Sequence, residues 1–352
     1  MALTTAQRAI IERARSLGAG GQGVSLTDEI CSYLVAVIAN DLGVATALPG
    51  LPASLPEFFG RERLCSLVVP GVSFLSLVER LVCLKPDADT YFACLAALHK
   101  ARLKYSRILE TQPIPTFEQV GPRGLLQYGT ASANVITALL FWRKWFFDID
   151  NRAGQETGYL FEPIIASAIG GTPASSSRSP VRRHNDEGKG RQVDCIRDKR
   201  AYEFKIRVTI AASGQGRWRE ELEFPLDCRL SGFVPVLVVL DATPNPKLAE
   251  LQRAYMEQKG EVHIGEAAWQ HLDAMAGSTM TIFLQKYVRS PIQAMLAEVP
   301  AQLPELVARM DDGGIELSIH GEIIRIRRAA VGANSDPEAS FPEDIDDQMP
   351  GQ

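Results

Sequence analysis

The sequence predicts an α/β (α+β) protein in which a helical N-terminal region precedes a β-sheet flanked by helices. Up to about residue 150, apolar residues recur at helical spacing, and the β-branched alternation typical of strands is hard to find. After Asp150, two β-like runs and one continuous apolar run alternate with helical segments. The predicted order of elements is therefore helix, strand, strand, helix, strand, helix.

Several helices are predicted in the N-terminal region. Ser25 and Asp28 form a capping-box pattern, in which a hydroxyl and an acid three residues later satisfy free amide donors at a helix start. A helix should follow over Asp28–Leu42, and the prolines after it interrupt the helical pattern. Three more helices are predicted over Val72–Leu84, Thr90–Leu109 and Ser132–Asp148, with a loop at Pro113 and Pro115.

The chain after Asp150 begins with a helix and a long polar segment. The helix is predicted over Glu156–Ala168, and Gly170-Gly171 should end it, because glycine readily adopts the backbone conformation of a helix C-cap. Residues Thr172–Gln192 are polar and are predicted to form a loop.

A hairpin and a buried strand are predicted next. Val193–Ile196 and Ala201–Ile210 flank a polar turn and should pair with each other. Val234–Asp241 is a continuous apolar run, typical of a strand buried on both faces. The remaining predicted elements are helices over Gly214–Glu223, Lys247–Lys259, Gly265–Ala274 and Thr279–Ala297, and a late hairpin over Ile315–Arg327.

These elements predict three parts of the chain. Residues 1–150 form the helical region, and residues 151–330 form the domain that holds the sheet. Residues 331–352 carry several acids and no base, which predicts a disordered acidic tail.

Composition excludes several classes of protein. Of the 352 residues, 46% are apolar and 22% are charged, so the chain is neither disordered, collagen-like nor of low complexity as a whole. The formal net charge of −5 argues against a protein that coats nucleic acid non-specifically, because such binding needs many lysines and arginines facing phosphates. A local basic site remains compatible with that charge.

Cysteines and histidines show no ligand pattern along the sequence. The six cysteines include no CxxC pair and no histidine at zinc-ligand spacing, which predicts reduced thiols without a disulfide framework or a structural zinc site. The histidines are dispersed, and each is interpreted as structural or exposed. They are His99, His184, His263, His271 and His320.

No segment is suited to secretion or to a membrane. Residues 1–18 predict an amphipathic helix without the apolar core of a signal peptide. The most apolar window, residues 135–147, is interrupted by Arg143 and Lys144 and is too short to cross a bilayer. We therefore expect a soluble, cytoplasmic protein.

The predicted hairpin carries the residues that indicate chemistry. Side chains alternate along a strand, so Glu203 and Lys205 share one face while Tyr202 and Phe204 share the apolar face. Pairing of the two strands carries Asp194 beside Glu203. Mg²⁺ takes carboxylate oxygens and keeps several waters, so two acids suffice when a phosphate supplies further ligands. Lys205 is placed to orient or deprotonate the attacking water, which predicts metal-assisted phosphodiester hydrolysis.

This pattern resembles the PD-(D/E)xK nuclease superfamily, in which an acid near the end of one strand and a Glu-x-Lys on the next form the active site. Asp194 matches the first acid, Glu203 the second and Lys205 the lysine. Val193 precedes the first acid where the superfamily name has proline. Members often carry a further glutamate on the helix before the hairpin, and Glu162 stands at that place.

Residues 156–292 resemble the catalytic portion of type II restriction endonucleases, and among these the ApaLI-like enzymes. The resemblance implies a restriction-endonuclease-like core with a central mixed β-sheet flanked by helices. It also implies a sequence-specific, Mg²⁺-dependent enzyme that hydrolyses double-stranded DNA, leaves 5′-phosphates and has a cognate methyltransferase as genetic partner. Because palindromic sites match two-fold symmetric proteins, a homodimer is expected. The helical region would then supply DNA contacts, dimer contacts, or both.

Positive charge is concentrated around the predicted site. Residues 178–219 hold twelve bases and five acids, a net charge of +7, which leaves −12 for the rest of the chain. Such a stretch is expected of a surface that follows phosphates. The predicted DNA-contacting residues are Arg182, Arg183, Lys189, Arg191, Arg207, Arg217 and Arg219.

Two alternative functions fit the same residues. One is another nuclease of the superfamily, such as a junction resolvase or a repair or modification-dependent nuclease. The other is a non-catalytic DNA-binding protein on the same scaffold, which the intact set of Asp194, Glu203 and Lys205 argues against.

Overall fold

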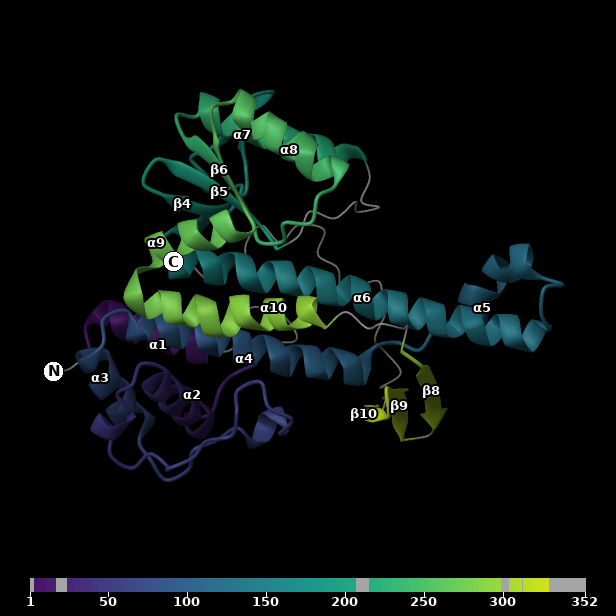
Figure 1. Cartoon of the computed structure of the whole chain (residues 1–352), viewed down its shortest axis with the longest axis horizontal. Coiled ribbons are helices and arrows are strands. Elements are labelled where there is room, and N and C mark those ends of the chain that lie inside the picture. The colour runs from purple at the N-terminus through teal and green to yellow at the C-terminus, as the bar shows by residue number, and fades with distance from the viewer. Residues whose placement is uncertain (1–2, 17–23, 207–214, 299–303, 312, 329–352) are drawn as a thin grey trace. The chain divides into compact units, whose positions relative to one another are not determined.

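A computed structural model describes residues 3–16, 24–206, 215–298, 304–311 and 313–328 (Figure 1). The chain divides into two compact units, and the predicted acidic tail, residues 331–352, lies outside the described residues. One unit comprises Met1–Lys100 and Gly158–Leu296, and the other comprises Ala101–Thr157 and Ala297–Glu343. No helix in the part of the chain that is described has the length and apolar character needed to cross a membrane.

The first unit opens with the helices α1 (Thr5–Arg15), α2 (Asp28–Asp41), α3 (Phe74–Leu84) and the start of α4 (Ala88–Thr111). Helix α2 is buried over ten consecutive residues, which explains its nearly continuous apolar sequence. Its N-cap is Thr27 and not the predicted Ser25, because the Thr27 hydroxyl accepts the amide proton of Ile30 at 3.4 Å.

A single long helix, α6 (Ala133–Ala168), replaces the two helices predicted over Ser132–Asp148 and Glu156–Ala168. The predicted break was wrong. Residues 149–155, between those two segments, contain no proline and a single glycine, so they continue the helix. The real interruption of the ladder is Pro163, which has no amide proton to donate. The predicted end is confirmed at Gly170, which has a φ of 71°.

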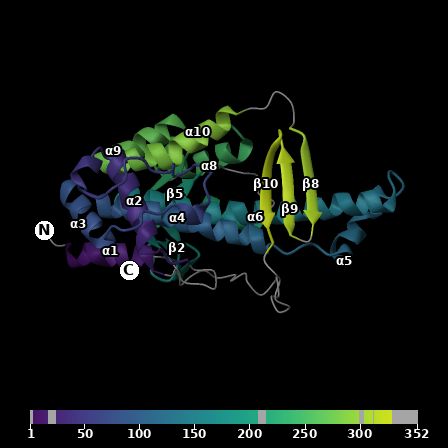
Figure 2. The same cartoon turned by 90° about the horizontal axis from the view of Figure 1, so that it is seen from below.

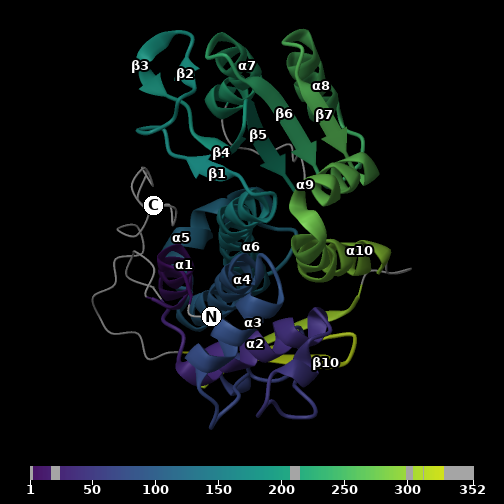
Figure 3. The ribbon, with the colours of Figure 1, turned by 90° about the vertical axis from the view of Figure 1, so that its left-hand side faces the viewer.

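A five-stranded mixed sheet forms the centre of the first unit (Figure 3). The strands lie in the order β1 (Thr172–Ala174), β4 (Val193–Arg197), β5 (Arg200–Lys205), β6 (Val234–Val239) and β7 (Glu261–Ile264). The β1, β4 and β5 pairings are antiparallel, whereas β5, β6 and β7 run parallel. The predicted hairpin and the predicted buried strand are thus β4, β5 and β6.

Helices cover the sheet. Helices α7 (Gln215–Leu230) and α8 (Pro246–Glu257) pack on β6, and their apolar residues join a buried cluster with Leu237 and Val239 of that strand. Helix α9 (Glu266–Leu284) packs on β7 and kinks at Gly277, which has a φ of 72°. A π-helical turn (Gln285–Arg289) and α10 (Ser290–Ala297) follow.

The polar segment predicted as a loop contains more structure than expected. It holds β1 and a small hairpin made of β2 (Arg182–Arg183) and β3 (Asp186–Gly190), and β2 lies against α7. The sequence here has no alternation of apolar residues that would predict strands, because polar side chains hold the β2–β3 hairpin in place.

The second unit contains α5 (Phe117–Val120), a 3₁₀ turn (Gly121–Gln127) and a three-stranded antiparallel sheet (Figure 2). The strands are β8 (Leu306–Asp311), β9 (Gly314–Ile319) and β10 (Glu322–Arg327). The predicted late hairpin is confirmed as β9 and β10, and its turn residues His320 and Gly321 both have positive φ, at 52° and 79°.

The compact units do not follow the ranges 1–150 and 151–330. Trp145 of α6 is fully buried against Ile315, Leu317 and Ile326, so the C-terminal strands group with the middle of the helical region. The remaining N-terminal helices group with the mixed sheet. The functional division of the chain at residue 150 stays a prediction.

Candidate active site

The β4–β5 hairpin brings Asp194 and Glu203 together. Cys195 pairs with Tyr202 in the antiparallel register, so Asp194 lies opposite Glu203 one step further along. Asp194 is only 7% exposed, and its Oδ2 accepts the backbone N–H of Phe204 at 2.8 Å. The carboxylate is therefore fixed by the neighbouring strand as well as by its own.

Lys205 lies between two glutamates. Its Nζ is 3.1 Å from Oε1 of Glu203 on the same strand and 3.4 Å from Oε2 of Glu221 on α7. Burial lowers the pKa of Lys205, but the nearby carboxylates of Glu203, Glu221 and Asp194 outweigh burial and raise it above its ordinary value. The amine is thus held in its charged form.

Glu221 was missed by the sequence analysis. It falls within the helix predicted over Gly214–Glu223, but no spacing in the sequence relates it to Lys205. Only the packing of α7 beside the sheet brings the two side chains together.

Glu162 of α6 joins the same group of charges, as the sequence predicted. Burial and the negative charge of Glu203 raise its pKa to about 7, while Lys205 opposes the shift. Burial and the charges of Glu203 and Glu162 likewise raise the pKa of Asp194 well above its usual range. The structure therefore gathers Glu162, Asp194, Glu203 and Lys205 at one place, although their catalytic roles remain predictions.

This donor set suits a hard divalent cation. Four carboxyl groups, those of Glu162, Asp194, Glu203 and Glu221, surround the single ammonium of Lys205, so negative charge is in excess. Burial and then repulsion from neighbouring carboxylates raise the pKa of Glu162 and Asp194, and a cation bound to these oxygens would relieve that repulsion. Carboxylate oxygens are the ligands that Mg²⁺ prefers.

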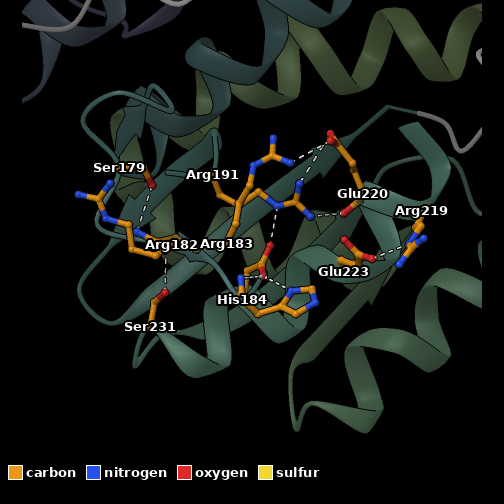
Figure 4. A network of polar contacts seen from close by, with 11 residues as sticks. Ser179, Arg182, Arg183, His184, Arg191, Arg219, Glu220, Glu223 and Ser231 are labelled. Carbon is orange, nitrogen blue, oxygen red and sulfur yellow. Dashed lines mark hydrogen bonds and ion pairs between the residues drawn. The ribbon is translucent and has the colours of Figure 1, made fainter. Parts of the chain in front are cut away.

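Arg191, one of the predicted DNA contacts, is buried instead (Figure 4). It is 5% exposed, and its Nε lies 2.7 Å from Oδ2 of Asp227 on α7. The other oxygen of Asp227 accepts the backbone N–H of His184 and contacts its Nδ1, both at 2.7 Å. Arg191 therefore holds the β2–β3 hairpin on α7, and we leave it out of the proposed DNA surface.

The other predicted DNA contacts that the structure describes lie nearer the surface. Arg183 forms an ion pair with Glu220 at 2.9 Å, and Arg219 forms one with Glu223 at 2.8 Å (Figure 4). Arg182 is exposed, as is Lys189, whose Nζ is 3.4 Å from Asp186. Arg207 and the side chain of Arg217 lie outside the part of the chain that the structure describes.

Comparison with known proteins identifies relatives of this chain. The family model of ApaLI-like restriction endonucleases matches residues 72–289, a range that contains Glu162, Asp194, Glu203, Lys205 and Glu221. The chain is also 40% identical to "Type II restriction enzyme ApaLI" of Acetobacter pasteurianus, over 91% of this chain and 94% of that protein. No solved structure matches the chain.

Proposed function

The chain belongs to the ApaLI-like restriction endonuclease family and is a type II restriction endonuclease, and we propose that its β4–β5 hairpin hydrolyses DNA with Mg²⁺, leaving 5′-phosphates. Enzymes of this class typically use a divalent metal ion. The observation that carries the proposal is the gathering of Glu162, Asp194 and Glu203 around the ammonium of Lys205. Neither alternative function is favoured by a feature of the structure.

Asp194 and Glu203 would hold the Mg²⁺. When bound, the ion would polarise the scissile phosphate and lower the pKa of the attacking water, so that the water gives up a proton more readily. Lys205 stays protonated between its glutamates, so it orients the water and offsets negative charge at phosphorus and does not act as the base. Glu162, with a pKa of about 7, suits acceptance of the proton from the water near neutral pH. The bond between phosphorus and the 3′ oxygen would then break, the 3′ oxygen would take a proton from solvent water, and the phosphate would stay on the 5′ end.

The exposed bases Arg182, Lys189 and Arg219 are the described candidates for phosphate contacts, together with Arg183. Arg207 and Arg217 are proposed from the sequence alone. We further propose that two copies act together on a palindromic site, with residues 1–150 supplying DNA or dimer contacts. The enzyme would work in the cytoplasm beside a cognate methyltransferase that protects host DNA.

Digestion of an unmethylated plasmid tests this proposal. With Mg²⁺ the wild-type protein should give discrete fragments whose sequenced ends carry 5′-phosphates, and EDTA should prevent cleavage. Asp194→Ala, Glu203→Ala and Lys205→Ala should abolish cleavage without unfolding the protein. Glu257→Gln, which removes an exposed carboxylate at the end of α8, is the matched control and should cut normally.

Two outcomes would contradict the proposal. Retained cleavage by purified Asp194→Ala would remove the assigned site. Cutting that depends on branched or modified DNA would point to a different nuclease activity on the same fold.

A further inference from the structure

A second group of metal-ligating side chains lies outside the proposed active site. Glu261 and His263 on β7 and His271 on α9 place one ligand atom each within 4.8 Å of one another. The two imidazole rings stack with their centroids 4.0 Å apart. Along the sequence these histidines were predicted to be unrelated, because they lie eight positions apart and a helix start falls between them.

The group lies on the opposite face of the sheet from the catalytic residues. Across the parallel strands, Tyr202 pairs with Val236, which pairs with Glu261, so these side chains share one face. Glu203 pairs instead with Leu237 and belongs to the other face. The ring of His271 lies 5.8 Å from that of Tyr202, which confirms that α9 covers the Tyr202 face.

Both histidines present a buried nitrogen toward the group. The Nε2 atoms of His263 and His271 are shielded from solvent. Nε2 of His263 has the carboxylate of Glu261 within ion-pair range, whereas Nε2 of His271 has no hydrogen-bond partner among the residues that the structure describes. Buried polar atoms are nearly always satisfied in proteins, so the unsatisfied nitrogen of His271 points to a missing partner.

The carboxylate of Glu261 also faces the two imidazole rings. Its Oε1 accepts a hydrogen bond from Nε of Arg200 at 2.9 Å, while its Oε2 lies 3.5 Å from Nε2 of His263. One oxygen is thus fixed by a supporting residue and the other faces the imidazoles. A hydrogen bond of this kind orients a ligand without occupying its metal-facing atom.

We propose that Glu261, His263 and His271 bind Zn²⁺, with a water completing a tetrahedral site. Imidazole nitrogen and carboxylate oxygen suit this borderline cation, which takes nitrogen at about 2.0–2.1 Å, whereas Mg²⁺ prefers the all-oxygen set on the other face. Because β7 is an edge strand of the sheet, the ion ties that edge to α9. The site lies apart from the proposed hydrolysis, and its ion would stabilise the fold by joining β7 to α9.

Zinc binding by the full-length protein in an Asp194→Ala background tests the proposal, because this background removes the proposed Mg²⁺ ligand. After removal of metal with a chelator, calorimetric titration should show about one Zn²⁺ per chain, and bound zinc should raise the melting temperature by several degrees. His263→Ala and His271→Ala should each lose this binding and melt like the metal-free parent. His320→Asn is the matched control, because asparagine tolerates the positive φ of that turn, and it should bind zinc normally.

Cobalt provides a readout that does not depend on how the variants fold. Co²⁺ in the same Asp194→Ala protein should show the intense visible absorption of a tetrahedral ion, and Zn²⁺ should displace it. A parent protein that binds no Zn²⁺, an octahedral cobalt spectrum, or undiminished zinc binding by His263→Ala and His271→Ala would each overturn the proposal.

Discussion

Asp227→Ala should destabilise the first unit, because it removes the nearest carboxylate from the buried Arg191 and leaves it only the more distant, exposed carboxylate of Glu220. The side chains of Arg191 and Asp227 are 6% and 1% exposed, and their charged atoms lie 2.7 Å apart. Asp227 also accepts the backbone N–H of His184 at 2.7 Å, so the substitution removes a second interaction from the β2–β3 hairpin.

The expected cost follows from this burial. Removing one partner of a buried ion pair costs about 3–5 kcal/mol when the other charge stays desolvated and unpaired. Arg191 keeps the carboxylate of Glu220 at 3.7 Å, so the lower end, about 3 kcal/mol, is expected here. In a domain of this size each kcal/mol lowers the melting temperature by about 2–4 °C, so a fall on the order of 10 °C is expected. Replacing both residues with apolar side chains, in Arg191→Met with Asp227→Leu, should recover most of the loss, because no unpaired charge then remains.

Urea unfolding followed by circular dichroism and tryptophan fluorescence measures these differences. Arg219→Met is the matched control on the same helix: its ion pair with Glu223 joins residues four apart, and the arginine side chain is 81% exposed. That substitution should cost less than about 1 kcal/mol. If Asp227→Ala were as stable as this control, the buried pair would not anchor the hairpin as the structure indicates.

Three further changes test the site and its support. The pKa of Glu162 is raised from 4.5 to about 7, so the folded state binds this proton more tightly than the unfolded state. The metal-free protein should therefore lose stability as pH rises from 4.5 to about 7, by at most about 3 kcal/mol. Melting temperatures across this range should show the loss, and Glu162→Gln should flatten the curve; an unchanged slope would refute the assignment. Glu221→Gln should reduce kcat about tenfold with little change in KM, because Lys205 loses the α7 carboxylate that helps to hold its ammonium in place; an unchanged kcat would show that Glu221 does not position Lys205. Gly171→Ala would place its Cβ 2.1 Å from Sγ of Cys195 and should cost about 1–3 kcal/mol by thermal melting, whereas Gly170→Asn, at an open position with positive φ, should melt close to wild type.

The hairpin of the proposed active site could be predicted because its geometry is local. Asp194, Glu203 and Lys205 lie within twelve residues, and strand alternation with antiparallel pairing is enough to bring them together. The continuous apolar sequence of β6 likewise indicates a strand inside the sheet and not at its edge. Glu162 was identified only because the sequence resembles a known superfamily.

The remaining features depend on contacts between distant elements. Glu221 reaches Lys205 only because α7 packs beside the sheet. His263 and His271 stack only because α9 packs on β7. The burial of Arg191 could not be foreseen either. Its partner Asp227 is 36 residues away, in a helix whose mixture of polar and apolar residues does not show which side faces the protein interior. Charge along the sequence thus overestimated the number of bases free to contact DNA.

The change of strand direction at β5 has a consequence for how such enzymes diversify. Its antiparallel neighbour β4 begins at the same edge of the sheet where the parallel strands β5 and β6 end. The segment that enters β4, with its β2–β3 hairpin, therefore ends beside the proposed metal ligands. We predict that mutations in this segment alter which DNA sequence is accepted, while the short turn at Asp198, at the far end of the β4–β5 hairpin, keeps Asp194 and Glu203 in register. Directed evolution of a new recognition site should begin there.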